Sequence, residues 1–158
     1  MPARATFKSV AGLNRALRKL PKAAATQLRD ASQAIATHVA DDARTKAEGV
    51  GGVAALVAPT IRVGRDRVPA VKMGSSQTLP DSGDGWERER DGTNQTIGDV
   101  MWGAEFGGRR RPTTQQFAPW RGSGRGAGYF LYPAIRQDED WIEDRYSEAL
   151  GEALEAVR

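Results

Sequence analysis

An alanine-rich segment between Pro21 and a cluster of glycines constrains the fold of this chain most strongly. Residues 22–48 are mostly good helix formers, and their apolar positions recur at helical spacing, at Leu28, Ala31, Ile35, Val39 and Ala43. Proline suits the first turn of a helix, and the glycines after residue 48 suit its end. The sequence therefore predicts one long helix. Because its apolar stripe is narrow and mostly alanine, this helix can approach another backbone closely but cannot fill a thick core alone.

Shorter elements are predicted on either side of the long helix. Residues 9–20 carry apolar side chains three and four positions apart, which predicts a short amphipathic helix before Pro21. Residues 56–63 and 68–73 are rich in β-branched side chains and are separated by a turn-forming segment, so we expect them to form a hairpin. Pro69 confines the second of these strands to the edge of a sheet or to a start after the proline.

The second half of the chain is predicted to contain one more strand and a terminal helix. Apolar residues alternate with others at Val100, Trp102, Ala104 and Phe106, which predicts a strand with one apolar face. Pro133 is expected to begin the terminal helix. The predicted fold is a single α+β domain of residues 1–158, with two helical arms on a small, mostly antiparallel sheet. Its parts are the helical residues 9–48, the sheet and loops of residues 53–128, and the C-terminal helix of residues 133–157.

The composition restricts the chemistry that this chain can perform. Its 158 residues and 17.1 kDa suffice for one domain with a core. The chain has no cysteine and one histidine, which excludes disulfides, thiolate catalysis and thiolate metal sites. No apolar run approaches the roughly 20 residues of a membrane span, and the first residues lack the apolar block of a secretory leader. We expect a soluble protein made in a cytosol.

Four patterns resemble catalytic or ligand sites, but each lacks an essential part. A Gly-x-Gly-x-x-Ala match at residues 122–127 has no strand before it and no helix directly after it, so we interpret it as a flexible loop. Residues 81–85 resemble the start of a calcium loop but place Gly83 at a ligand position. No nucleophile or orienting group can be assigned to His38. Carboxylates four residues apart on the terminal helix are typical of a solvated or docked face. We predict no catalytic residue, no cofactor and no metal; an enzyme with few motifs stays an alternative.

The net charge of +3 is distributed unevenly along the chain. Residues 1–48 hold nine basic and four acidic residues, a net charge of +5, and residues 49–132 add a further +3. Residues 133–158 hold three arginines and eight acids, a net charge of −5. Ends of opposite sign attract within one chain or between copies arranged head to tail, although two solvated helix faces would also account for the pattern.

The arginine-rich and glycine-rich loop of residues 107–128 carries the strongest functional signal in the sequence. It contains five arginines, no acid, and two aromatic residues that are suited to stacking or anchoring. Such a loop can contact phosphates, but arginine and tryptophan are also enriched at the hot spots of protein interfaces. We favour protein docking, because the acidic terminal helix offers a complementary surface. The predicted interface residues are Arg109, Arg110, Arg111, Phe117, Trp120, Arg121, Arg125, Asp140 and Asp144.

The order of the predicted elements and two short motifs resemble a known protein family. The sequence VMWGAEFG covers residues 100–107, and YFLYPAI covers residues 129–135. With the long alanine-rich helix, they resemble the neck, or tail-completion, family of long-tailed bacteriophages, in which an aromatic/Glu-Phe-Gly strand end and an aromatic-x-x-Pro-Ala helix start recur. The motif residues are Trp102, Glu105, Phe106, Tyr129, Pro133 and Ile135. We expect Glu105 and Phe106 to fix the corner after the strand, and Trp102, Phe106 and Ile135 to pack in the core.

The resemblance implies a structural virion protein that forms an oligomeric ring around the DNA channel at the head-to-tail interface. Its expected partners are copies of itself, a head-closure or stopper protein, and tail-tube or tail-terminator proteins. DNA in the lumen would be contacted without sequence specificity, and no membrane is involved. The expected location is the neck or tail of the virion, after assembly in the host cytoplasm. The neck layer stays open between connector, tail completion and tail terminator. The alternative is a basic nucleic-acid-binding protein that uses the arginine-rich loop of residues 109–125.

Overall fold

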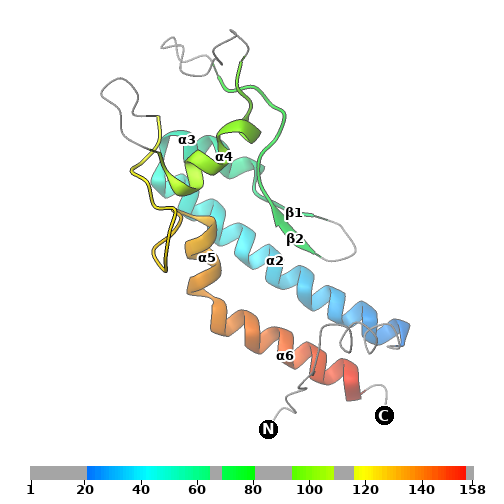
Figure 1. The fold of residues 1–158 in the computed structure, drawn as a ribbon. Coiled ribbons are helices and arrows are strands. Elements are labelled where there is room, and N and C mark those ends of the chain that lie inside the picture. The colour runs from blue at the N-terminus through cyan, green and yellow to red at the C-terminus, as the bar shows by residue number, and fades with distance from the viewer. Residues whose placement is uncertain (1–20, 65–68, 81–93, 109–115, 156–158) are drawn as a thin grey trace.

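The computed structural model describes residues 21–64, 69–80, 94–108 and 116–155 (Figure 1). The predicted helix of residues 9–20, the calcium-like segment of residues 81–85, and Arg109, Arg110 and Arg111 lie outside the described residues. The fold is α+β, with a small two-stranded antiparallel sheet and helices from both halves of the chain.

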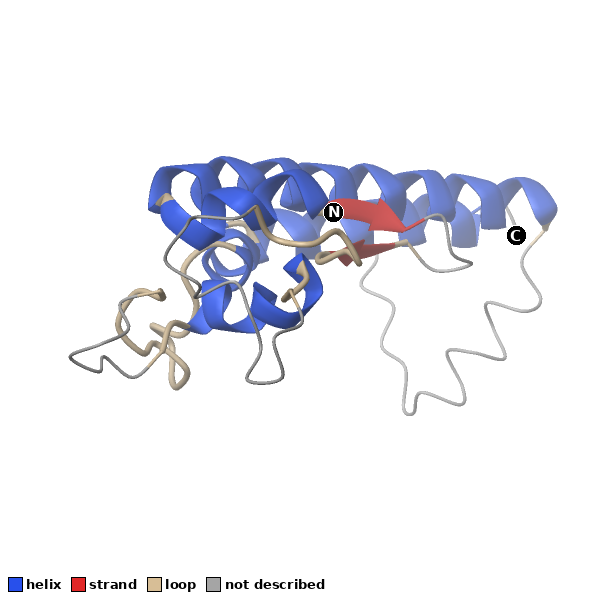
Figure 2. Cartoon of the chain, turned by 90° about the horizontal axis from the view of Figure 1, so that it is seen from above, coloured by secondary structure: helices blue, strands red, loops and turns tan. Residues whose placement is uncertain are grey.

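Helix α2 (Lys22–Val50) is the longest helix of the described residues, and most of the other elements pack on it (Figure 2). It begins directly after Pro21 and ends at Gly51, whose φ of +75° suits a residue without a side chain. Its buried face is mostly alanine, with Ala40, Ala43 and Ala47 fully covered. The predicted long helix is therefore confirmed, and it extends two residues beyond the expected end.

The predicted hairpin is present, but its strands are shorter than the sequence pattern indicated. Residues from the first predicted strand instead form α3 (Gly52–Val57) and the 3-10 helix η1 (Ala58–Thr60). The antiparallel strands are β1 (Arg62–Gly64) and β2 (Ala70–Lys72), and Val63 lies opposite Val71. Val53 and Val57, four residues apart, are both buried in the core, and this helical spacing favours a helix over a strand.

The third strand expected at residues 100–106 is wrong, because this segment is the helix α4 (Ile97–Phe106). A capping box begins the helix. The Asp99 backbone N–H donates to the Thr96 hydroxyl, and the Asp99 carboxylate accepts from the Thr96 backbone N–H at 2.7 Å. Ile97, Val100 and Ala104 share the buried face at helical spacing. The alternation of apolar residues was therefore a coincidence within a helical pattern.

The C-terminal region forms two helices where the sequence predicted one. Helix α5 (Leu131–Gln137) begins two residues before Pro133, and α6 (Glu139–Glu155) follows a break at Asp138. Both pack on α2, and α6 runs antiparallel to it (Figure 1). At the break, the Asp138 carboxylate lies 2.9 Å from the His38 ring. This contact joins the break between α5 and α6 to α2.

The core lies where α2, α3, α4 and α5 meet. Its largest fully buried side chains are Phe130, Ile61, Glu105 and Val57, of which only the glutamate is charged. The small sheet packs on α2 and closes one side of this core. None of the helices in the described part of the chain is both long and apolar enough to cross a membrane.

Candidate functional site

Glu105, near the end of α4, is a buried carboxylate that joins α4 to α5. Its side chain is 0% exposed and accepts hydrogen bonds from three consecutive backbone N–H groups. The distances are 3.2 Å to Phe130 N, 2.9 Å to Leu131 N and 2.9 Å to Tyr132 N. N–H groups in the first turn of a helix have no partner within the helix, and a negative charge is favoured there by the helix dipole. The carboxylate therefore caps α5 from a distant part of the sequence.

Gly128 makes room for this cap. A Cβ atom at residue 128 would overlap the Glu105 Oε1 atom, and the backbone there has a φ of +82°, in the left-handed region. Both constraints favour glycine. The two motifs noted in the sequence thus contact each other, because Glu105 near the end of α4 binds Tyr132 at the start of α5.

An exposed aromatic patch lies directly beside the capped helix end. We define the aromatic patch as Trp102, Phe106, Trp120, Tyr132 and Ile135, from α4, the loop after it and α5. The outer members of the patch are Trp102 (53% exposed), Trp120 (63%), Tyr132 (44%) and Ile135 (41%). Phe106 lies at the centre, with ring centroids 5.9 Å from Trp102, 6.4 Å from Trp120 and 5.2 Å from Tyr132. Contiguous exposed apolar side chains of this size mark interaction sites.

Backbone contacts hold the loop of residues 116–128 against α4. The Arg121 N–H donates to the Phe106 carbonyl at 2.6 Å, and the Gly108 N–H donates to the Ala118 carbonyl at 2.9 Å. The Trp120 ring lies so close to Gly122 that a Cβ atom there would overlap it. Residues 122–127 form a loop, as predicted, and the bonds at Ala118 and Arg121 on its N-terminal side hold Trp120 beside the end of α4.

Arginines surround the patch on the side of this loop. The Arg121 guanidinium lies 4.7 Å from the centre of the Tyr129 ring, and the Arg136 guanidinium lies 5.9 Å from the centre of the Tyr132 ring. Arg136 also donates to the Ala127 carbonyl. Arg125 is exposed in the turn between these residues. Trp120 and Arg121, both predicted as interface residues, thus lie next to the patch, and the predicted Arg125 is exposed in the turn that follows them.

Three residues predicted to pack in the core, namely Trp102, Ile135 and Phe106, are exposed or partly exposed. Trp102 and Ile135, expected in the core, are exposed members of the aromatic patch, because helices α4 and α5 turn them away from α2. Phe117, predicted as an interface residue, is partly buried and packs on α4, where a Cβ atom at Gly103 would lie 2.5 Å from its ring. Phe106 is partly exposed rather than fully buried.

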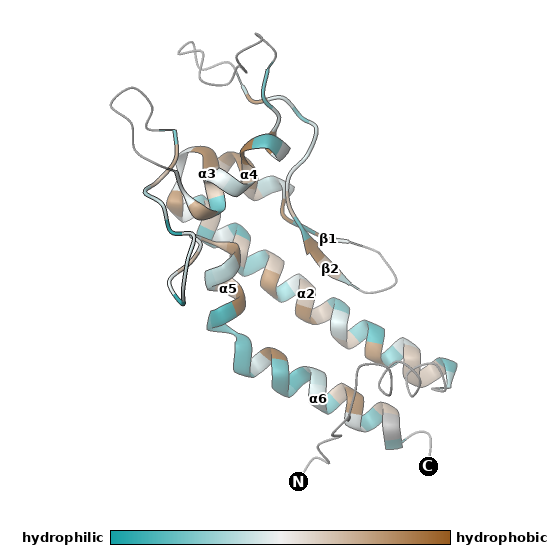
Figure 3. Ribbon diagram, viewed as in Figure 1, coloured by the Kyte–Doolittle hydropathy of each residue, from teal (hydrophilic) through white to brown (hydrophobic). Residues whose placement is uncertain are grey.

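The acidic residues of α6 form a second exposed surface. Asp140 and Asp144 are exposed on the side opposite the buried Ala149 and Ala153. Figure 3 shows most of α6 as hydrophilic, in contrast to the hydrophobic residues of α3 and α4. Neither Asp140 nor Asp144 forms an ion pair with another residue that the structure describes.

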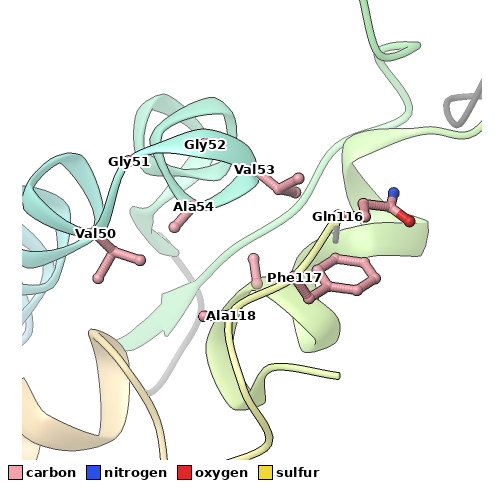
Figure 4. A pocket seen from close by; sticks show the side chains of 9 residues that line it. Val50, Gly51, Gly52, Val53, Ala54, Gln116, Phe117 and Ala118 are labelled. Carbon is pink, nitrogen blue, oxygen red and sulfur yellow. The ribbon is translucent and has the colours of Figure 1, made fainter. Parts of the chain in front are cut away.

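A hollow of about 250 Å³ lies between the start of α3 and residues 116–118 (Figure 4). Among the described residues, those that line it are apolar or small, apart from Gln116, and offer no acid, base or nucleophile; they are Val50, Gly51, Gly52, Val53, Ala54, Ala104, Gln116, Phe117 and Ala118. In the same part of the chain, no three acidic or histidine side chains gather closely enough to hold a metal ion. His38 contacts the Trp141 ring at a centroid distance of 4.5 Å, as well as Asp138. Its contacts are those of a residue that joins two helices.

Comparisons with known proteins identify no relative. No protein-family model, no curated protein and no solved structure matches this chain.

Proposed function

We propose that this protein is a structural virion protein that forms a ring at the head-to-tail interface of a long-tailed phage and joins head to tail around the DNA channel. The observation that carries the proposal is the exposed aromatic patch. Four large apolar side chains stay more than two-fifths exposed although they are held at fixed positions by α4, α5 and the loop between them. Exposing this much apolar surface is unfavourable in an isolated subunit and is relieved when a partner covers it.

The separation of the patch from the acidic surface supports a ring in particular. A ring closes through interfaces in which one face of a subunit meets a different face of the next subunit. The patch lies at the α4 and α5 end of the molecule, and Asp140 and Asp144 lie on α6, which leads away from that end (Figure 1). Two different, chemically complementary faces on one chain are what this kind of closure requires.

Locating the protein in purified particles would test the proposal. We expect several copies per virion, placed by imaging as one layer between head and tail. A single copy per particle, or none, would contradict the ring. Replacing Arg109, Arg110 and Arg111 with alanine tests the loop separately: folding should be retained and head-to-tail joining impaired, so a normal yield of virions would exclude this role for the three arginines.

A second candidate function is nucleic-acid binding without sequence specificity. The observation that favours it is the exposed ring of Trp120 next to the exposed Arg121 and Arg125, since aromatic rings stack on bases and arginines contact phosphates. Affinity for DNA that falls steeply with salt, together with a small particle size, would support this function over the ring.

A further inference from the structure

We infer that the aromatic patch is the docking site for the outer, acidic face of α6 of a second copy of this chain. The inference deepens the proposed function, because it names the two surfaces that meet in the proposed ring. It depends on the chemistry of both surfaces and on the impossibility of their meeting within one chain.

The receiving surface combines apolar area with positive charge. Trp102, Trp120 and Tyr132 supply the exposed aromatic area. Arg136 lies 5.9 Å from the centre of the Tyr132 ring, Arg121 borders the patch through its backbone bond to Phe106, and the exposed Arg125 follows in the same loop. Tryptophan, tyrosine and arginine are the residue types that dominate the energy of protein interfaces. An acidic partner is favoured, because a carboxylate beside the border pairs with the arginines while apolar atoms cover the rings.

The outer face of α6 has the complementary chemistry. Asp140, Asp144, Glu148 and Glu155 recur at helical spacing on the side away from the face that packs on α2. Of these, Glu148 is paired with Arg145 of the same helix at 3.2 Å. Ser147, a small exposed residue, lies between the acids, so the backbone of α6 can come close to a flat aromatic surface there. The face is narrow, negative and free of bulky side chains at its centre.

Within one chain, α6 is attached along α2. α6 packs along α2, which directs its acidic face away from the rest of the molecule. The Asp138 carboxylate contacts His38 at the start of α6, and the Gln27 amide donates to Glu152 near its end, so both ends of α6 are attached to α2. Because α6 cannot fold back over α5, the complementary charges are satisfied between copies and not within one copy.

Cross-linking of the purified full chain tests the inference directly, because the natural sequence contains no cysteine. Ser123→Cys places a thiol in the exposed loop beside the patch, and Ser147→Cys places one on the acidic face. Neither change removes an aromatic ring or a charge. The two variants carry tags of different size, are mixed, and are oxidised together. Thr45→Cys, exposed on α2 and outside both surfaces, replaces either partner as the control.

We expect the mixture of Ser123→Cys and Ser147→Cys to form mixed disulfide dimers about tenfold more than either control mixture, because docking raises the local thiol concentration. Reversing the border charges with R121E and R125E should abolish the excess. Introducing D140K and D144K on the partner copy should then restore it.

Mixed dimers no more abundant than in the control mixtures would overturn the inference. So would dimers that form mainly between two copies of Ser123→Cys, since these would indicate that the patch meets another patch. The outcome is independent of the virion assay: absence of the protein from particles would refute the proposed function and leave the docking intact. Failure of cross-linking, with a ring seen in particles, would refute the docking alone.

Discussion

Replacing Glu105 with alanine should destabilise the fold severely, since the carboxylate is the shared acceptor of three backbone N–H groups. A buried N–H without an acceptor costs about 1–3 kcal/mol. Phe130 N is fully buried, but the other two groups are only partly buried, so water can replace part of the lost carboxylate. The low end of the range therefore applies to the Leu131 and Tyr132 groups and a higher value to Phe130 N, so we expect a loss of at least about 3 kcal/mol in the free energy of unfolding.

Glu105→Gln separates the charge from the shape of the side chain. Oε2 accepts two of the three hydrogen bonds and Oε1 accepts one. The glutamine amide can therefore keep its oxygen at the Oε2 position, but its NH₂ group then replaces Oε1 and faces the Tyr132 N–H. We expect a smaller loss, about 1–2 kcal/mol. Glu48→Ala, at an exposed site in α2, serves as the control and should change stability by less than about 0.5 kcal/mol.

Urea unfolding and thermal melting measure these differences. For a chain of this length, a loss of about 3 kcal/mol corresponds to a melting temperature lower by about 6–12 °C. A Glu105→Ala protein that melts within about 2 °C of the natural chain would refute the view that this carboxylate joins α4 to α5.

Further predictions concern stability and association. Hydrogen bonds from the Thr96 hydroxyl and then from its backbone N–H lower the pKa of Asp99 below its ordinary value of 3.8. The stabilisation that Asp99 provides is therefore present above that pH and is lost as the pH falls further. In unfolding measurements from pH 7 to pH 2, the stability difference between the natural chain and Asp99→Ala should vanish in acid, and a difference that stays constant would contradict this prediction. Gly103→Ala forces a methyl group against a phenyl ring and should cost about 1–3 kcal/mol. Gly151→Ala, in α6 with open space around it, should raise stability by about 0.5–1 kcal/mol. Melting curves of the Gly103→Ala and Gly151→Ala proteins show whether room for the methyl group or helix propensity determines the effect at each site. Trp102→Ala should leave the melting temperature within a few degrees but reduce the disulfide cross-linking described above, and undiminished cross-linking would remove this residue from the interface.

The long helix could be predicted because its signals are local. Pro21, the run of good helix formers and the glycines that follow them act within a few residues of one another, and the structure places the boundaries within two residues of the expected ones. The hairpin was predictable for the same reason, although β1 and β2 proved shorter.

Helix α4 shows where a pattern of hydrophobic residues misleads. Alternation over residues 100–106 suggested a strand, but Thr96 and Asp99 form a capping box just ahead of it. That signal was present in the sequence and would have favoured a helix. Once the segment is helical, Trp102 lies on a different face from Val100 and Ala104, which explains why it is exposed and not in the core.

The role of Glu105 could not be predicted from the sequence. Local patterns do not show that a carboxylate 25 positions away from Phe130 meets the N-terminus of α5. The aromatic patch was hidden for the same reason, since it forms only when α4 and α5 lie next to each other. Of the aromatic patch itself, the sequence predicts only Trp120 as an interface residue, on grounds of composition, together with the neighbouring Arg121 and Arg125 of the same loop.

The contact between Glu105 and the start of α5 also determines how this region can change during evolution. The cap joins the two ends of the segment between Glu105 and Phe130, so this segment begins and ends at the same place whatever its length. Doubling such a segment costs only about 0.6 kcal/mol of closure entropy. Changes in the length of this segment are therefore tolerated, as long as Glu105 and Gly128 keep the cap of α5 in place.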